Sequence, residues 1–510
     1  MRRDPHSYND DTQAETDSIA LSARVDFAQK ILHAEAELTF KQPGSGTLDL
    51  DTRDLHIDRV SDHHGAALPF TLHPAEPFLG ARLSIELPGG TRSIRIAYRT
   101  SPDASALQWL EPAQTMGGKH PYLFSQCQAC HARSIIPLQD TPRLRIRYTA
   151  ELTVPKTLKV VMAAADRGRT EHGNSATEKW EMPQPIPPYL FAFAVGDLAS
   201  RDLSPRCRVW AEPGQVEAAA YEFADVEAMI HSAESLFGPY DWDRFDILTM
   251  PPSFPYGGME NPRLTFITPT VLAGDRSLVS VIAHELAHSW TGNLVTNANG
   301  EHFWLNEGFT MYAERRITEA LEGADMASLS AALGRRELDE SIARFHDRPQ
   351  MTRLRVPMWG VDPDDAYSLV PYEKGYFFLS AIEAAVGRSA FEAWLKTYLR
   401  DFRFGAITTE DFERHIEAGL PGALAKVDAR TWIDGEGVPA AAVPPRSKRL
   451  DAIDALHGAA PPEEVASTWN ATEWNLYLET IARPAGHDLL NTLEARFHLT
   501  ASNNYDVLVA

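Results

Sequence analysis

The chain has 510 residues, 44% of them hydrophobic and 23% charged, a composition typical of a folded protein with several domains. Its 48 basic and 70 acidic side chains give a formal charge of -22, which disfavours binding to nucleic acid or to anionic membranes. With only three cysteines and no apolar run of about 18 residues, the sequence predicts a soluble, cytoplasmic protein without a disulfide framework.

The first part of the chain is predicted to be a β-domain spanning residues 1–198. Apolar and polar residues alternate in ARLSIEL and again in SIRIAY, on either side of Pro88-Gly89-Gly90. This period of two is typical of a sheet with one solvated face. We therefore expect antiparallel strands from about Leu21 to Leu198.

Beyond Glu217 the apolar residues recur with the period of a helix. Long helices are predicted at 217–237, 277–291, 305–322, 327–345 and 373–386, several of them closed by glycine, as at Gly292 and Gly323. These segments predict a mainly helical domain with a small sheet over residues 199–440.

The stretch GEGVPAAAVPPRSK at 435–448 is rich in residues that disfavour regular structure. We assign a Pro-rich linker to residues 441–455. Residues 456–510 form the start of another helical domain. Because the sequence stops within the apolar segment DVLVA, we expect this last domain to be incomplete.

A metal site is predicted from His284-Glu285-Leu286-Ala287-His288, because residues four apart share one helical face and both imidazoles can reach one ion. A catalytic zinc needs a third protein ligand and an open position for water. Glu307 begins the next predicted helix and reaches the ion if the two helices pack antiparallel. The alternative is a solvated helix face that matches by chance, which the second carboxylate segment disfavours. We expect one zinc ion per chain.

The residues around the predicted zinc also suggest a reaction. Zinc lowers the pKa of bound water from 15.7 to about 7, and Glu285 is placed to take the released proton and pass it to a leaving amine. Upstream, Gly257-Gly258-Met259-Glu260 combines glycines that allow a close backbone approach with a carboxylate suited to a free α-ammonium group. This pattern favours a peptidase acting at the amino end. A tight turn with a surface glutamate explains the segment equally well when it is considered alone.

Four motifs, GGMEN, HELAHSW, TGNLVT and HFWLNEGFT, together resemble the gluzincin aminopeptidases, from about Gln108 to Asn504. The stretches SQCQACHARSIIPLQDTP, GGMENPRLTFITPTVLAGDRSL and AYSLVPYEKG are most similar to the leukotriene A(4) hydrolase and aminopeptidase B branch. Patterning and resemblance together predict a multi-domain α+β fold with an N-terminal antiparallel β-domain, a thermolysin-like zinc peptidase domain and a C-terminal α-helical domain.

The resemblance implies roles for individual positions. His284, His288 and Glu307 would bind zinc, with Glu285 as the general base. Tyr372 would donate a hydrogen bond to the oxyanion that forms when the carbonyl is attacked; without the resemblance, a buried tyrosine is the simpler interpretation. The residues implied in substrate binding are Gln126, Gln128, Gly257, Gly258, Met259, Glu260, Asp364 and Tyr367.

The implied substrate residues differ in their expected contributions. The amides of Gln126 and Gln128 suit the amino end of a peptide because they donate and accept without adding charge. In the leukotriene hydrolase, the acidic residue matching Asp364 is linked to epoxide opening and to basic first residues. Taken by itself, Asp364 lies in a good turn sequence.

Two departures from the family are visible. Phe309 stands where the nearest relatives usually carry histidine, and it touches no ligand. In the leukotriene hydrolase branch, basic residues of the C-terminal helical domain hold the substrate carboxylate, and we expect this sequence to end before reaching them. A preference for short peptides is therefore implied by the branch alone.

The expected partners are peptide substrates with a free N-terminus, without nucleic acid or membrane, and a monomer is favoured. Alternative functions are a lipid epoxide hydrolase, an endopeptidase of the thermolysin type, and an idle binding protein of the same fold. Cys127-Gln128-Ala129-Cys130-His131 also spells a c-type haem attachment motif, which we disfavour because the surrounding residues match the peptidase family.

Overall fold

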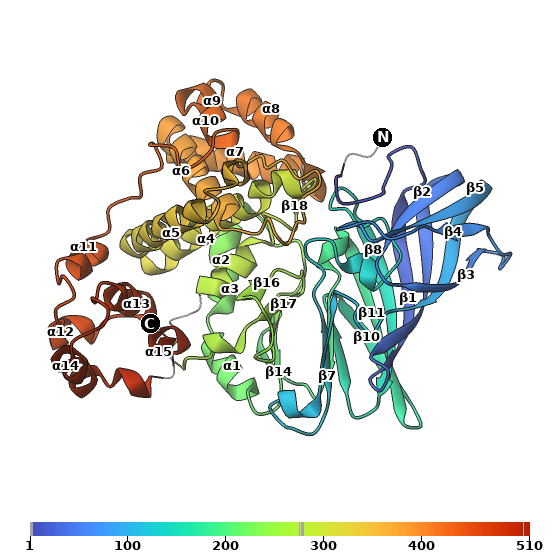
Figure 1. Cartoon of the computed structure of the whole chain (residues 1–510), viewed down its shortest axis with the longest axis horizontal. Helices are drawn as coiled ribbons and strands as arrows, with labels where there is room; N and C mark the ends of the chain where they lie inside the picture. The colour runs from blue at the N-terminus through green and yellow to red at the C-terminus, as the bar shows by residue number, and fades with distance from the viewer. Residues whose placement is uncertain (1–3, 275, 277–279, 503, 510) are drawn as a thin grey trace.

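Strands occupy the first part of the chain and helices most of the remainder in the computed structural model, which describes residues 4–274, 276, 280–502 and 504–509 (Figure 1). The predicted α+β class is confirmed. The larger apolar clusters of the described residues form separate cores, one centred on the N-terminal sheets, one among the central helices and one among the C-terminal helices.

One sheet of the N-terminal region runs in the order β10-β11-β8-β1-β2-β5-β3, with β4 paired to β5. Inward residues of its strands, including Leu48, Leu83 and Ile94, are fully buried, as the alternating pattern predicts. The bounds are β1 Thr16–Asp26, β2 Ile31–Thr52, β3 His56–Asp62, β4 Phe70–Leu72, β5 Ala81–Arg99, β8 Ile146–Pro155, β10 Ala165–His172 and β11 Ser175–Ile186.

Two features of this sheet differ from the simplest interpretation of the pattern. The Pro88-Gly89-Gly90 interruption lies within the single strand β5, where the register with β2 shifts opposite Gly44 and Gly46. Gly90 adopts φ +87°, so the interruption is a bulge. Strands β1 and β8 pair in parallel, although the rest of this sheet is antiparallel. Alternation fixes the buried face of a strand but not the direction of its neighbour.

Two smaller sheets connect the β-rich region to the central helices. One runs β6-β7-β12-β9 and the other β13-β14-β15-β17-β16. Their bounds are β6 Leu107–Leu110, β7 Tyr122–Ser125, β9 Lys159–Met162, β12 Phe193–Gly196, β13 Ala199–Ser204, β14 Cys207–Ala211, β15 Asp246–Thr249, β16 Gly258–Met259 and β17 Leu264–Ile267. A further pair joins β18 Val295–Asn297 to β19 Gly405–Ile407. The loop after β7 and the edge strand β16 supply residues to the site.

The central helices follow the predicted segments with three differences. The segment 217–237 forms two helices, because Phe223 and Val226 both enter the core at the break. The predicted helix 277–291 is described from Ser280 to Ala287, and residues 277–279 lie outside the described part. The segment 373–386 begins as a π-helix, Val370–Lys374, which continues into an α-helix. Gly323 closes its helix as predicted, at φ +93°.

The helices of this region are α1 Val216–Glu222, α2 Val226–Phe237, α3 Ser280–Ala287, α4 Trp304–Glu322, α5 Ala324–Arg344, α6 Gly375–Val386, α7 Arg388–Asp401, α8 Thr409–Gly419, α9 Ala423–Lys426 and α10 Ala429–Ile433. Helices α3 and α4 pack against each other and carry the predicted metal ligands.

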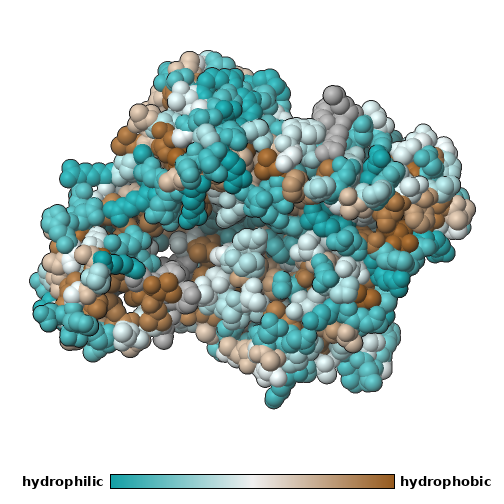
Figure 2. Space-filling model, viewed as in Figure 1, coloured by the Kyte–Doolittle hydropathy of each residue, from teal (hydrophilic) through white to brown (hydrophobic). Residues whose placement is uncertain are grey.

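The last helices form a small separate cluster around Trp474, Tyr477 and Leu493. They are α11 Lys448–Asp454, α12 Glu463–Ala466, α13 Ala471–Glu479, α14 His487–Phe497 and α15 Tyr505–Val509. Helix α11 lies within the range predicted as a linker, 441–455. Figure 2 shows a largely polar face with apolar residues gathered over these C-terminal helices. Among the described residues, no helix has the length and apolar character needed to span a membrane.

Candidate active site

Two histidines of the α3 segment and one glutamate of α4 converge to form a small triangle of donor atoms. The Nε2 atoms of His284 and His288 are 3.2 Å apart. Oε2 of Glu307 lies 3.6 Å from Nε2 of His284 and 3.5 Å from Nε2 of His288. A tetrahedral zinc about 2.0–2.1 Å from each ligand requires separations of roughly 3.3 Å between them. The three donor atoms therefore fit one face of a zinc coordination tetrahedron.

The Nδ1 atoms of both histidines have hydrogen-bond partners, and this orients the Nε2 atoms toward the triangle. Nδ1 of His284 lies 3.0 Å from Oε2 of Glu314. Nδ1 of His288 lies 3.1 Å from both the carbonyl oxygen of Thr291 and Oγ1 of Thr310. Such outer contacts fix the tautomer and orientation of metal-binding histidines. Oε2 of Glu307 is buried and has no hydrogen-bond partner in the described part of the chain, as expected of a metal ligand.

Several acidic side chains are buried close together in the site. Burial, together with the charges of Glu307 and Glu285, raises the pKa of Glu260 well above its usual range. Burial raises the pKa of Glu285 to about 8 and lowers that of His288 to about 4, so His288 is neutral, the form that binds metals. Burial opposes protonation of His284, but the neighbouring carboxylates of Glu307 and Glu314 raise its pKa well above the usual value. Such a carboxylate-rich pocket favours cations.

Glu285 lies against the edge strand β16. A Cβ atom added to Gly258 would lie 2.2 Å from Oε1 of Glu285, far inside van der Waals contact. A side chain at position 258 would therefore displace the carboxylate. This close approach gives Gly258 a steric role that the sequence pattern alone left open.

Gln128 and Glu260 meet at the other side of the triangle. Nε2 of Gln128 donates to Oε1 of Glu260 over 3.3 Å, and the Glu260 backbone carbonyl accepts from Nδ2 of Asn293 at 2.7 Å. Gln128 comes from the loop after β7 and Glu260 follows β16, so two distant segments form this part of the site.

Tyr372 lies in the π-helix, an uncommon element that often marks functional sites. Its ring is nearly parallel to that of His284, with centroids 6.1 Å apart. Tyr367 lies edge-on to it at the same distance. Burial and the charge of Glu307 raise the pKa of Tyr372 well above its usual range. The phenol is therefore protonated and available as a hydrogen-bond donor.

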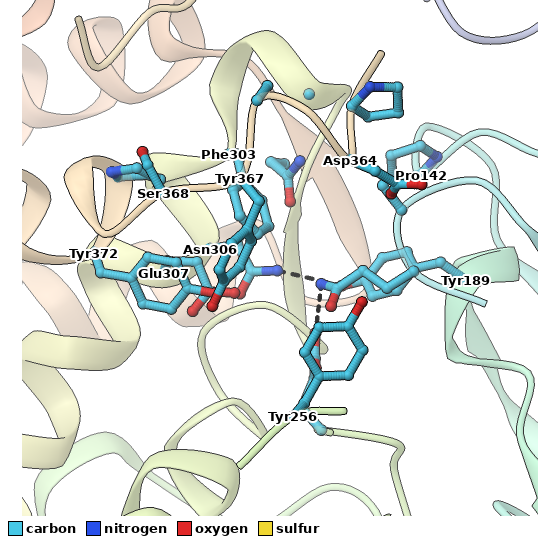
Figure 3. Close-up of a pocket in the computed structure, with 18 of the residues that line it drawn as sticks. Pro142, Tyr189, Tyr256, Phe303, Asn306, Glu307, Asp364, Tyr367, Ser368 and Tyr372 are labelled. Atoms are coloured by element: carbon cyan, nitrogen blue, oxygen red, sulfur yellow. Dashed lines mark hydrogen bonds between the residues drawn. The ribbon is translucent and has the colours of Figure 1, made fainter. Parts of the chain in front are cut away.

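These groups line one cavity of about 700 Å³. Figure 3 shows Tyr372 and Glu307 at one side of the view, with Tyr189 and Asp364 at the other and Tyr256 between them. The predicted residues on the cavity wall are Gln128, Gly257, Gly258, Glu260, His284, Glu285, His288, Glu307, Asp364, Tyr367 and Tyr372.

Two predicted substrate residues, Gln126 and Met259, are not among the residues that line this cavity. Met259 is 2% exposed and packs in the core of the β-rich region, because adjacent residues of a strand face opposite sides and Gly258 faces Glu285. Nε2 of Gln126 lies 3.2 Å from Sδ of Met259, behind the wall. Direct contact of Gln126 and Met259 with substrate therefore stays a prediction.

Several residues near the site were not predicted. Glu314 lies seven residues after Glu307, two helical turns along the same face, so helical periodicity gives a usable signal for it. Tyr189 receives a hydrogen bond from Nδ2 of Asn306 and comes from the β-rich region, where no local pattern marks it. His131 contacts Asp364, and its only sequence signal was the haem-like motif.

The cysteines of that motif have no exposed thiol. Cys127 and Cys130 are buried and unpaired, and burial raises the pKa of Cys130 to about 12. Both side chains are therefore protonated thiols that pack as apolar groups.

Known proteins with related sequences match both halves of the chain. The family profile described as Peptidase family M1 domain matches residues 221–432, and that described as Peptidase M1 N-terminal domain matches residues 4–190. The chain is 44% identical over 450 residues to the leukotriene A-4 hydrolase of Xenopus laevis, covering 86% of this chain and 74% of that relative. It is 43% identical over 424 residues to leucine aminopeptidase 2 of Yarrowia lipolytica, covering 80% and 64%.

Solved structures agree with these sequence matches. Yeast LTA4 hydrolase in complex with bestatin superposes with a TM-score of 0.90 at 32% identity, covering 99% of this chain and 86% of that chain. An M1 zinc metallopeptidase from Deinococcus radiodurans shares the fold, with a TM-score of 0.69 at 21% identity, covering 85% of this chain and 97% of that chain.

Proposed function

This chain belongs to peptidase family M1 and is a zinc-dependent aminopeptidase, and we propose that His284, His288 and Glu307 bind a single zinc ion in it. The observation that carries the proposal is the triangle of donor atoms with sides of 3.2, 3.5 and 3.6 Å. Its buried, unpartnered carboxylate oxygen and its two oriented histidines suit zinc in chemistry as well as in spacing.

The proposed substrates are peptides with a free amino terminus. A substrate ammonium group would bind at Glu260, whose buried carboxylate is surrounded by other acidic groups, with Gln128 offering its side-chain oxygen as a second acceptor. Binding a cation there relieves the repulsion among the buried carboxylates. An amino-blocked peptide cannot supply that charge, so the arrangement supports cleavage that starts from the chain end.

The chemistry is divided among groups that face the donor triangle. Zinc, when bound, supplies a Lewis acid that polarises the first carbonyl oxygen and makes water a stronger acid. Glu285 accepts a proton from the attacking water and delivers one to the departing amine. Its raised pKa suits a group that both accepts and returns a proton near neutrality. Tyr372 donates its phenolic proton in a hydrogen bond to the developing oxyanion.

The decisive test measures hydrolysis of aminoacyl anilides and their amino-blocked counterparts, before metal removal, after chelation and after restoring zinc. We expect activity only on the unblocked compounds, loss with the chelator and recovery with zinc, at one zinc per chain by elemental analysis. Equal cleavage of blocked and unblocked compounds would favour an endopeptidase. Zinc binding without cleavage of any member would favour a non-catalytic protein of the same fold.

A lipid epoxide hydrolase activity is the second candidate. The cavity is lined by the apolar side chains of Met351, Leu354, Val356 and Met358 as well as by Asp364 and Tyr367, and such a mixed lining would suit a hydrocarbon chain with a polar group. One sequence relative is named a leukotriene A-4 hydrolase. Turnover of an epoxide fatty acid, compared with an aminoacyl anilide under the same conditions, tests this activity directly.

A further inference from the structure

Tyr372, the proposed hydrogen-bond donor to the oxyanion, is followed in the chain by two buried charged residues. Glu373 is 2% exposed and Lys374 is fully buried. Both belong to the π-helix Val370–Lys374, but neither is among the residues that line the cavity. A buried charge is costly unless it is paired or hydrogen-bonded. The partners of these two side chains therefore show what the charges do.

Glu373 forms a bidentate ion pair with Arg315 of α4. Nη1 of Arg315 donates to Oε2 of Glu373 at 2.9 Å, and Nη2 donates to Oε1 at 2.7 Å. Nη2 also donates to the carbonyl oxygen of Ser330 in α5 at 3.2 Å, and the guanidinium carbon lies 4.0 Å from the ring centroid of Tyr376. Such a pair fixes orientation as well as distance. It therefore sets the position of the π-helix relative to α4, the helix that carries Glu307.

Three glycines allow the elements around this ion pair to approach closely. A Cβ atom added to Gly308 would lie 2.8 Å from Cα of Gly375, so the backbone of α4 touches the start of α6. Gly334 of α5 lies against the ion pair, since an added Cβ would be 2.2 Å from Oε2 of Glu373. Helices α4 and α5 lie side by side (Figure 1). A side chain at any of these glycines would push the elements apart.

Lys374 fixes the π-helix to a different part of the domain. Its Nζ atom donates to the carbonyl oxygen of Thr352 at 2.8 Å and to that of Gly435 at 2.7 Å. Thr352 ends a 3-10 helix, Pro349–Thr352, and Gly435 follows α10. Glu373 and Lys374 thus attach adjacent residues of the π-helix to separate elements.

The position of the Tyr372 hydroxyl depends on this backbone. The ring centroid of Tyr372 lies 6.1 Å from the rings of His284, Phe303 and Tyr367. A tyrosine side chain has only two rotatable torsions, so its hydroxyl follows a shift of the backbone. An oxyanion donor must lie about 2.7–3.1 Å from the developing charge. A misplacement of about 1 Å can cost about 100-fold in rate.

We propose that Arg315, Glu373 and Lys374 are positioning residues that hold the Tyr372 hydroxyl at the distance the oxyanion requires. They act through the backbone of the π-helix. The inference rests on the proposed aminopeptidase function. Arg315 directly follows Glu314, whose carboxylate contacts a metal-binding histidine, so two neighbouring residues of α4 orient a metal ligand and the oxyanion donor.

The test measures kcat and KM for a leucyl anilide in Glu373→Gln, Lys374→Met, Arg315→Met and Arg315→Lys proteins, each with and without Tyr372→Phe. We expect Glu373→Gln to lower kcat about tenfold and to change KM by less than about twofold, because the oxyanion forms only in the transition state. Lys374→Met should act in the same way. Arg315→Lys should retain more activity than Arg315→Met, because an ammonium group keeps part of the ion pair.

The Tyr372→Phe background separates positioning from a general structural role. This substitution alone should lower kcat about 100-fold, and Glu373→Gln should then have no further effect. Because a single substitution leaves a buried charge without its partner, the paired variant Arg315→Met/Glu373→Met is measured too, with zinc content and thermal unfolding for every protein. It should fold, bind zinc and still lose about tenfold in kcat.

The matched control is Arg316→Met. Arg316 is the next residue of α4 and pairs with Glu392 of α7, so its loss should change kcat by less than about twofold. Equal losses of kcat with and without the Tyr372 hydroxyl, or a normal kcat in the paired variant, would overturn the inference alone. An unmodified protein that cleaves no aminoacyl anilide would instead contradict the proposed function, and the inference with it.

Discussion

The donor triangle and the substrate wall of the same cavity are built in different ways. His284, His288 and Glu307 lie on two packed helical segments within a short stretch of chain, and their outer contacts come from the same segments. The substrate wall instead combines the loop after β7, the edge strand β16 and the loop before the π-helix. The metal ligands are therefore close together in the sequence. The residues of the substrate wall come from segments that are far apart in the sequence and meet only in the folded protein.

The difference has an energetic basis. Metal ligands are fixed by helical periodicity and by the mutual packing of α3 and α4, which the spacing of a motif already encodes. The wall depends on single hydrogen bonds between segments, such as those of Gln128 with Glu260 and of His131 with Asp364. We expect substitutions of the metal ligands or of the general base Glu285 to abolish turnover. Substitutions in the substrate wall should change which substrates are used.

The largest effect is expected for Glu285→Gln. The amide keeps the shape of the side chain but cannot accept and return a proton, so kcat should fall by about 10²–10⁴-fold. Zinc content, measured by elemental analysis, should stay at the unmodified level because Glu285 is not a member of the donor triangle. Retention of full activity would show that the proton acceptor lies elsewhere.

Gly258→Ala changes the point where the substrate wall contacts the general base Glu285. The added Cβ would lie 2.2 Å from Oε1 of Glu285, so the carboxylate must move and kcat should fall by about 100-fold. The matched control is Gly257→Ala, whose Cβ would meet only Cγ1 of Val281 at 3.9 Å, within the described part of the chain. Similar activities in the two variants would contradict this steric role.

The contrast between local metal ligands and a non-local substrate wall explains which site residues the sequence predicts and which it cannot. Helical spacing indicated His284 and His288, and it also contains a signal for Glu314, which follows Glu307 by two turns. The position of Met259 behind the wall required the direction of β16, because a two-residue strand has no alternating pattern to read. The pairing of β1 with β8 and the contact of His131 with Asp364 depend on tertiary packing between distant segments.

Glu314→Gln sharpens the comparison within the metal region. The variant removes the charge next to Nδ1 of His284 while keeping an oxygen that can accept its hydrogen bond. Zinc affinity should fall by about 10–100-fold, with near-normal kcat at saturating zinc. Glu319→Gln, on the same helix but paired with Arg316 and Arg388, is the control and should bind zinc normally. A competitive zinc chelator titration measures both.

The smallest effects should separate the two glutamines of the wall. Gln128→Ala removes a hydrogen-bond partner of Glu260 that faces the cavity, so KM for aminoacyl anilides should rise about tenfold with little change in kcat. Gln126→Ala removes only the contact with the Met259 sulfur behind the wall, so KM should change by less than about twofold. If the order were reversed, the position of Gln126 would have to change when substrate binds. The wall would then be a region that rearranges on binding, in contrast to the fixed triangle of metal ligands.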